Sequence, residues 1–216
     1  MVSADPPRNP SHHLAMRDPS PWVVRFARLI PTGGAVLDLA CGGGRHARHL
    51  ISLGHRVVAV DRMVDAVADI ADTAEVIEAD LENGSPWPLA GRRFDGIVVV
   101  NYLYRSLFPI LIDSLTPNGV LIYETFARGN ERYSRPRNPD HLLMGGELLS
   151  LLGDTLQVVA YEHGILEKAS CPGVVQRICA VNDRRSSRRE NGEADPHAIY
   201  APGQQQPVTE SDTQVS

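Results

Sequence analysis

Residues Val36 to Ala47 read VLDLACGGGRHA, and this stretch decides the fold of the chain. It begins as an apolar run suited to a buried strand, includes Asp38, and passes into three consecutive glycines, Gly42 to Gly44. Successive glycines permit a tight turn that a side chain would obstruct. Residues Arg45 to Leu53 then have the apolar spacing of a helix that faces a sheet. A strand, a glycine turn and a helix indicate a nucleotide-binding corner, because backbone N–H groups gather at the helix N-terminus.

The composition is that of a globular protein, with 43% hydrophobic and 22% charged residues among 216. The net charge of -5 gives no global attraction toward nucleic acid or an anionic membrane. The apolar run Ile97 to Val100 is too short to span a bilayer, and the opening residues MVSADPPRNP lack the apolar core of a secretory signal. The three cysteines, Cys41, Cys171 and Cys179, lack metal-ligand spacing. We therefore expect a cytoplasmic protein without a metal site.

Apolar strand-like segments alternate with helical ones along most of the chain. After the corner, strands are expected at 57–60, 75–78, 97–100 and 120–123, with helical segments at 63–72 and 106–115. This alternation predicts crossover connections and a largely parallel sheet. Residues 156–161 and 174–181 form two further strands with no helix between them, which favours antiparallel pairing. We predict a single α/β domain: a doubly wound, mostly parallel seven-stranded sheet with a C-terminal antiparallel strand pair.

Composition also divides the chain into three parts. Residues 1–19 contain four prolines and little apolar periodicity, so we expect a flexible segment. Ser20 and Pro21 then have the residue types of a helix cap and a first helical position, and the folded domain is expected over 20–182. Residues 183–216 offer few apolar side chains to bury and are expected to be disordered.

The glycine turn also fits a second class of cofactor site. Gly42, Gly44 and Ala47 satisfy the dinucleotide pattern G-x-G-x-x-G/A, and Asp61 lies nineteen residues beyond Gly42, where a ribose-binding acid belongs. A nicotinamide-dependent oxidoreductase is therefore an alternative. Asp38 argues against it, because a carboxylate inside the strand does not help to bind a pyrophosphate but suits a positively charged ligand.

Five stretches resemble, in order, the successive motifs of class I, Rossmann-like S-adenosylmethionine-dependent methyltransferases. They are VLDLACGGGRHA at 36–47, AVD at 59–61, EADLE at 78–82, FDGIVVVNYL at 94–103 and LTPNGVLIYE at 115–124. In detail the chain is most similar to the small bacterial tellurite-resistance-type methyltransferases. The resemblance covers about residues 22–182 and implies methyl transfer with S-adenosyl-L-methionine as the cofactor.

The resemblance assigns cofactor-binding roles to residues at the carboxyl ends of the predicted strands. They are Asp38, Ala40, Gly42, Gly44, Asp61, Arg62, Asp80, Leu81 and Asn101. In this assignment Asp38 and the turn hold the amino acid part of the cofactor, and Asp61 bonds the ribose hydroxyls. Asp80 and Leu81 bond the adenine edge. The simpler interpretation is that Asp38 caps the turn and that Asp61 and Asp80 are helix-cap or turn residues.

The acceptor side is less defined by the sequence. The sulfonium already activates the methyl group, so a base is needed only for an acceptor that carries a proton. Candidate catalytic residues are His46, Tyr102 and Tyr104, although the simplest expectation for His46 is a surface position on its helix. Candidate substrate-binding residues are Tyr102, Arg128 and Arg132, and arginines suit a carboxylate, phosphate or oxyanion.

The residues after the fourth predicted strand bear on the class of acceptor. Amino-methylating enzymes of nucleic acids often carry Asn-Pro-Pro-Tyr or Asp-Pro-Pro-Tyr there, whereas this chain has Asn101-Tyr102-Leu103-Tyr104. The missing prolines and the acidic net charge argue against a nucleic acid partner. We expect a small-molecule acceptor, with an anionic one favoured. A non-catalytic S-adenosylmethionine-binding protein is a further alternative.

Overall fold

The stretch from residue 36 to 47 forms the expected strand, turn and helix in the computed structural model of the chain. Strand β1 covers Ala35–Leu39, and helix α2 covers Arg45–Ser52. A backbone hydrogen bond closes the turn: the N–H of Gly44 donates to the carbonyl of Cys41 over 2.9 Å. The local pattern therefore folds as its residue types predict.

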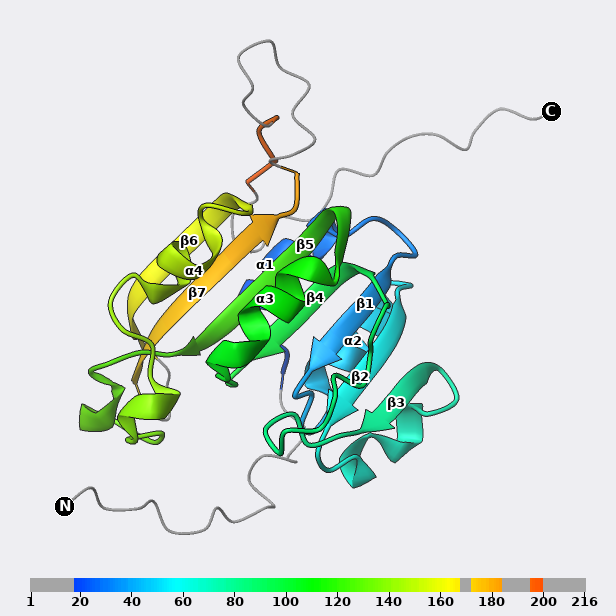
Figure 1. Cartoon of the computed structure of the whole chain (residues 1–216), viewed down its shortest axis with the longest axis horizontal. Helices are drawn as coiled ribbons and strands as arrows, with labels where there is room; N and C mark the ends of the chain where they lie inside the picture. The colour runs from blue at the N-terminus through cyan, green and yellow to red at the C-terminus, as the bar shows by residue number, and fades with distance from the viewer. Residues whose placement is uncertain (1–17, 168–171, 184–194, 200–216) are drawn as a thin grey trace.

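The structure describes residues 18–167, 172–183 and 195–199 (Figure 1). Most of the predicted flexible segment 1–19, most of the predicted tail 183–216, and Cys171 lie outside these ranges.

Seven strands and four α-helices make up the described domain. The remaining strands are β2 Arg56–Asp61, β3 Ala74–Glu78, β4 Phe94–Val100, β5 Leu115–Phe126, β6 Gln157–Leu166 and β7 Gly173–Val181. The other α-helices are α1 Pro21–Phe26, α3 Phe108–Asp113 and α4 Glu147–Leu152. Short 3-10 helices are η2 Ala27–Leu29, η3 Asp65–Ile70, η4 Arg105–Leu107, η5 Asn130–Arg132 and η6 Pro139–His141.

The sheet has the strand order β3-β2-β1-β4-β5-β7-β6. The pairs from β3 to β5 are parallel, whereas β7 is antiparallel to both β5 and β6. The predicted fold class is confirmed, including its C-terminal antiparallel pair. The strand order reverses between β1 and β4, and open α/β sheets bind their ligands at the carboxyl ends of strands beside such a switch point.

Helices lie on both faces of the sheet (Figure 1), and two hydrophobic clusters fill the space between the helices and the sheet. One contains Trp22 and Phe26 of α1 together with Leu50 of α2. The other contains Phe108 of α3 and Leu152 of α4. Successive strand residues point to opposite faces, so each central strand contributes to both clusters. The packing of helices on both faces fixes the positions of the strand ends, where the site is built.

Two segments differ from the sequence-based expectation. The strand expected at 120–123 is longer, because residues 115–119 also belong to β5 and contain an irregularity in its pairing: Phe94 pairs with Leu115, but Gly96 pairs with Val120. The predicted helical segment 63–72 is the 3-10 helix η3. Its buried residues, Val67 and Ile70, are three apart, which matches the three residues per turn of a 3-10 helix.

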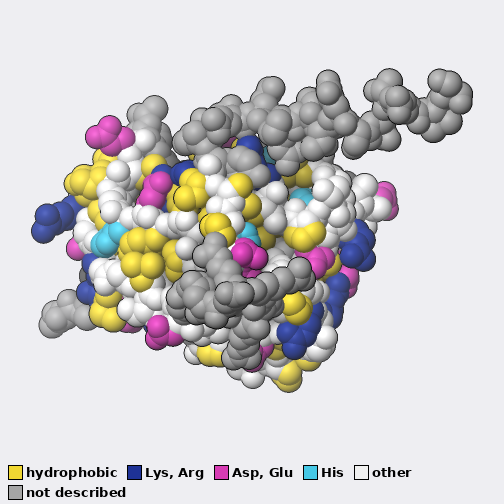
Figure 2. Space-filling view, turned by 90° about the horizontal axis from the view of Figure 1, so that it is seen from above, with side chains coloured by type: hydrophobic (Ala, Val, Ile, Leu, Met, Phe, Trp, Pro, Cys, Tyr) yellow, Lys and Arg dark blue, Asp and Glu magenta, His cyan; other side chains and the backbone are white. Residues whose placement is uncertain are grey.

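No helix in the described part of the chain is long and apolar enough to cross a membrane. On the face shown in Figure 2, acidic and basic side chains are interspersed and do not form one large field of a single sign.

Candidate active site

The candidate site lies where the parallel strands of the sheet end. Asp38 is inside β1 near its carboxyl end, Asp61 is the last residue of β2, and Asn101 follows β4. Asp80 follows β3 by two residues. Because parallel strands end at the same edge of the sheet, the fold brings the predicted cofactor-binding residues to one edge.

Asp38 is almost fully buried, with 1% of its surface exposed. Its Oδ2 accepts a 2.8 Å hydrogen bond from the backbone N–H of Ala47 in the first turn of α2. Its Oδ1 is also buried and has no hydrogen-bond partner among the described residues. Burial raises the pKa of this carboxyl to about 7, although the Ala47 N–H and Arg45 act in the opposite direction. A buried carboxylate oxygen without a donor is costly, so the site suits a ligand that brings a donor or a positive charge.

The glycine turn is held in a conformation that side chains disfavour. Gly42 and Gly44 have φ of 54° and 71°, and Ala40 shares the left-handed region with φ of 53°. A Cβ atom on Gly44 would lie 2.5 Å from Cγ1 of Val67. Gly42 donates its N–H over 2.8 Å to Oδ2 of Asp61. The turn after β1 is therefore tied directly to the end of β2.

Asp61 and Asp80 each accept a hydrogen bond from the backbone N–H of the residue two positions later in the chain. Oδ1 of Asp61 accepts from the N–H of Met63 over 3.1 Å, and Oδ1 of Asp80 accepts from Glu82 over 2.9 Å. These are the bonds of turn residues. They do not exhaust the carboxylates, because each ionised carboxylate has about four acceptor positions. Arg62, beside Asp61, is exposed.

A cavity of about 480 Å³ lies next to the end of β3. Its lining includes Asp80 and Leu81, the indole of Trp87, and Tyr104 from the segment after β4. Apolar and aromatic side chains together with a few polar groups are typical of the lining of small-molecule and cofactor sites. Two residues that the resemblance assigned to the adenine thus share one cavity.

His46 does not occupy the expected surface position. It is 4% exposed, because the segment before α1 packs against it, and its Nε2 accepts a 3.2 Å hydrogen bond from the N–H of Ser20. Burial lowers the pKa of His46 to about 3. The signal for burial was in the sequence, since His46 and Leu50 are four residues apart and share the buried face of α2.

Two hydrogen bonds join the segment after β4 to residues of β5. Asn101 is exposed, has φ of 59°, and donates its N–H to the carbonyl of Glu124 over 2.8 Å. The hydroxyl of Tyr123 donates to the carbonyl of Tyr102 over 2.7 Å. The pKa of the Tyr102 phenol is raised by burial and by the carboxylate of Glu82. This phenol therefore stays protonated at neutral pH.

Arg105 and Glu147 form a contact that sequence reasoning missed. Nε of Arg105 donates to Oε1 of Glu147 over 2.6 Å, and its other donors bind the carbonyls of Asp140 and Leu142. The second Glu147 oxygen accepts from the N–H of Met144 over 2.7 Å. We call this group the loop clamp, because it holds the end of the loop 127–146 against the segment after β4.

The candidate substrate-binding arginines lie on that loop. Arg128 and Arg132 are exposed, and neither makes a side-chain hydrogen bond or salt bridge within the described ranges. In Figure 1 the loop lies at the edge toward which β1, β4 and β5 point.

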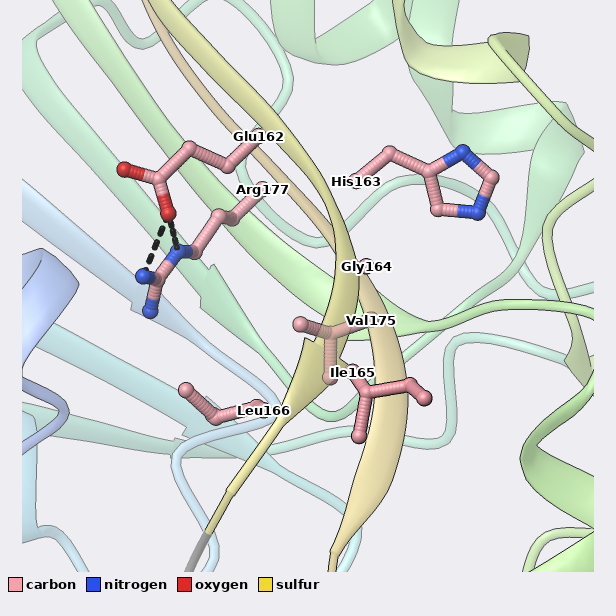
Figure 3. Close-up of a pocket in the computed structure, with 7 residues that line it drawn as sticks. All are labelled: Glu162, His163, Gly164, Ile165, Leu166, Val175 and Arg177. Carbon is pink, nitrogen blue, oxygen red and sulfur yellow. Dashed lines mark hydrogen bonds and ion pairs between the residues drawn. The ribbon is translucent and has the colours of Figure 1, made fainter.

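A second missed group lies at the carboxyl end of β5. Glu124 is 3% exposed and accepts a 3.0 Å hydrogen bond from the hydroxyl of Ser20. Arg177 donates to Glu162 (Figure 3). It also lies 3.6 Å from the carboxylate of Glu124 and packs over the ring of Trp22. Arg177 also lines a cavity of about 310 Å³ at the end of the β6–β7 hairpin. Since two carboxylates neutralise its charge, this cavity is not built for an anion.

Comparison with known proteins also points to the methyltransferases that the sequence motifs resemble. A model described as a methyltransferase domain matches residues 36–119. The chain is 30% identical over 135 residues to the ubiquinone biosynthesis O-methyltransferase of Xanthomonas axonopodis pv. citri, a match that covers 58% of this chain and 55% of that protein. The chain thus spans about half the length of the curated relative that it matches.

Solved structures of similar fold include TehB from Haemophilus influenzae, with a TM-score of 0.62, 18% identity, and coverage of 74% of this chain and 61% of that one. The N-methyltransferase NodS from Bradyrhizobium japonicum WM9, in complex with S-adenosyl-L-homocysteine, has a TM-score of 0.57 and 18% identity over 80% of this chain and 96% of that one. At this identity each likeness concerns the fold. In its matched domain model, its seven-stranded topology and the motifs at its strand ends, the chain is similar to the class I S-adenosylmethionine-dependent methyltransferases.

Proposed function

We propose that the chain transfers the methyl group of S-adenosyl-L-methionine to a small anionic acceptor. The observation that carries the cofactor assignment is the unpartnered, buried Oδ1 of Asp38 beside the glycine turn. The amino acid part of the cofactor brings an ammonium group, which supplies both the donor and the positive charge that this carboxylate lacks. The residues present therefore fit the cofactor of the family.

Each part of the cofactor has a proposed partner at the strand ends. Asp38, Ala40 and the turn at Gly42 and Gly44 bind the amino acid part, and Asp61 binds the ribose. Asp80 and Leu81 bind the adenine in the cavity of about 480 Å³. Arg62 packs over the adenine ring, and Asn101 lines the place of methyl transfer. When bound, the cofactor supplies a methyl group that its sulfonium charge already activates. The protein then has to orient the donor and acceptor and to exclude water.

The candidate catalytic side chains at the carboxyl ends of the strands bear on the chemistry of the acceptor. His46 is neutral, buried and already bonded to the backbone of Ser20, so it is unsuited to remove a proton from an acceptor. The raised pKa of Tyr102 makes its phenolate inaccessible at neutral pH. We therefore propose an acceptor that is nucleophilic without a protein base, such as a carboxylate, a thiolate or a metalloid oxyanion. The exposed Arg128 and Arg132 suit such a charge.

The cofactor assignment is tested by calorimetric titration with S-adenosylhomocysteine. We expect the wild-type chain to bind it and Asp61→Ala to bind it much more weakly, because the ribose hydroxyls lose their acceptor. Asp65→Ala is the matched control, since this exposed carboxylate in η3 has no proposed contact with the cofactor. Unchanged affinity in Asp61→Ala would contradict the site. Tight binding of NADH, followed by fluorescence, would instead support the oxidoreductase alternative.

The acceptor is tested by turnover with isotopically labelled donor and a panel of thiols, carboxylates and metalloid oxyanions. Hydroxylated aromatic compounds belong in the panel as well, because the curated relative is named as an O-methyltransferase. Mass spectrometry of a cell extract treated with the labelled donor extends the search. Label on neutral amines alone would contradict an anionic acceptor, and no turnover despite cofactor binding would favour a non-catalytic binding protein.

A further inference from the structure

Arg48 in helix α2 joins three segments that meet at the glycine turn. Its guanidinium donates to the carbonyl of Gly43 and, over 3.1 Å, to the carbonyl of Ala66. It also donates to both carboxylate oxygens of Asp69. Gly43 belongs to the turn, whereas Ala66 and Asp69 belong to η3, which follows β2. One side chain therefore fixes the turn relative to the segment after Asp61.

The turn and η3 are in close contact at the same place. A Cβ atom on Gly44 would lie 2.8 Å from Nη1 of Arg48, as well as within clashing distance of Val67. One backbone group of each glycine binds a different partner. Gly42 donates its N–H to Asp61, the carbonyl of Gly43 accepts from Arg48, and Gly44 donates its N–H to the carbonyl of Cys41. The conformation of the turn thus depends on these partners, because glycines alone restrict the backbone least of all residues.

We infer that Arg48 is a positioning residue for the amino acid end of the cofactor and acts through the carbonyl of Gly43. The inference rests on the proposed function, since it concerns the same cofactor site. The side chain is 23% exposed and donates four hydrogen bonds within the protein, so it works behind the turn without needing to touch the cofactor. A planar guanidinium presents its donors in a fixed fork, which the single ammonium of lysine cannot reproduce.

This role predicts that loss of Arg48 affects one half of the cofactor more than the other. The turn faces the amino acid part, whereas Asp80 and Leu81 are proposed to bind the adenine. S-Adenosylhomocysteine carries both parts, and 5′-methylthioadenosine lacks the amino acid part. The two ligands therefore separate a displaced turn from a general loss of the site.

The experiment is calorimetric titration of the full chain and its variants with both ligands, together with thermal unfolding. In Arg48→Met we expect the affinity for S-adenosylhomocysteine to fall about tenfold or more and that for 5′-methylthioadenosine to change less than about threefold. Arg48→Lys should restore little of the loss. Asp69→Asn is the matched control, because this 64% exposed carboxylate can be neutralised while the bonds to Gly43 and Ala66 remain. Its affinities should stay within about threefold of the wild type.

Three results would overturn the inference. One is an unchanged affinity of Arg48→Met for S-adenosylhomocysteine. Another is an equal loss for both ligands with a lowered melting temperature, which would give Arg48 a purely structural role. The third is complete rescue by Arg48→Lys. Absence of S-adenosylhomocysteine binding by the wild-type chain would overturn the proposed function itself, and the inference with it.

Discussion

Among single residues, Asp38 carries the clearest coupling between ligand binding and protons. Its pKa is raised to about 7 by burial, so a large fraction of the free protein holds a proton there at neutral pH. A cofactor ammonium beside it favours the ionised form, so we expect S-adenosylhomocysteine binding near pH 7 to release up to about half a proton. Affinity should therefore weaken as the pH falls below 7.

Calorimetry in two buffers of different ionisation enthalpy, such as phosphate and Tris, measures this release. The binding enthalpy of the wild type should differ between the buffers, and that of Asp38→Asn should not. Equal enthalpies for the wild-type chain in both buffers would contradict a titrating Asp38.

His46 predicts a pH dependence of stability with a defined sign. Its pKa is about 3 in the folded chain against an ordinary value of 6.5, so the unfolded chain binds more protons between these values. The contribution of the buried neutral ring is fully present above pH 6.5 and is lost as the pH falls toward 3, by about 1.4 kcal/mol per pH unit at most. The raised pKa of Asp38 acts in the opposite direction between about 4 and 7.

The variant His46→Gln isolates the histidine contribution, because an amide oxygen can still accept from the N–H of Ser20. Urea unfolding at pH 7 and at pH 4.5 should show a smaller loss of stability on acidification in His46→Gln than in the wild type. The same loss in both proteins would rule out this role for His46.

At the scale of elements, Ser20 connects helix α1 to the sheet. Its hydroxyl accepts from the N–H of Trp22 as the helix cap and donates to the buried carboxylate of Glu124. Ser20→Ala removes both bonds and leaves Glu124 short of a donor, so we expect the free energy of unfolding to fall by about 1–3 kcal/mol.

Denaturant unfolding compared with Ser52→Ala checks this effect. Ser52 is exposed, and its hydroxyl bonds only the carbonyl of His49 three residues earlier, so its removal should cost less than about 0.5 kcal/mol. A loss in Ser20→Ala no larger than in Ser52→Ala would contradict the connection.

Local patterns could predict the elements but not the contacts between them. Val36 to Ala47 folds as expected, because strand, turn and helix preferences there agree with each other. The contacts of Arg105 with Glu147 and of Ser20 with Glu124 join residues 42 and 104 positions apart. Such pairings depend on strand order, which residue spacing does not encode. The cofactor-binding roles of the strand-end residues remain predictions.

On the scale of the whole molecule, the residues proposed to bind the methyl donor and those proposed to bind the acceptor are held by different groups of contacts. The turn and the end of β2 belong to the proposed cofactor side, whereas the loop clamp of Arg105 and Glu147 holds the loop after β5. The two groups share no residue. Changes in the clamp should therefore alter the acceptor side and leave cofactor binding intact.

Arg105→Met tests this separation. The change removes donors from Glu147 and from the carbonyls of Asp140 and Leu142, so amide hydrogen exchange over residues 127–147 should accelerate, while exchange in β1 and β2 stays unchanged. Since the arginine side chain is 39% exposed, the free energy of unfolding should fall by only about 1–2 kcal/mol. Affinity for S-adenosylhomocysteine should stay within about twofold. Arg56→Met, which removes a single exposed bond to the carbonyl of Gly33, is the matched control. Unaltered exchange in the loop, or a cofactor affinity that falls along with it, would show that the two groups of contacts are not independent.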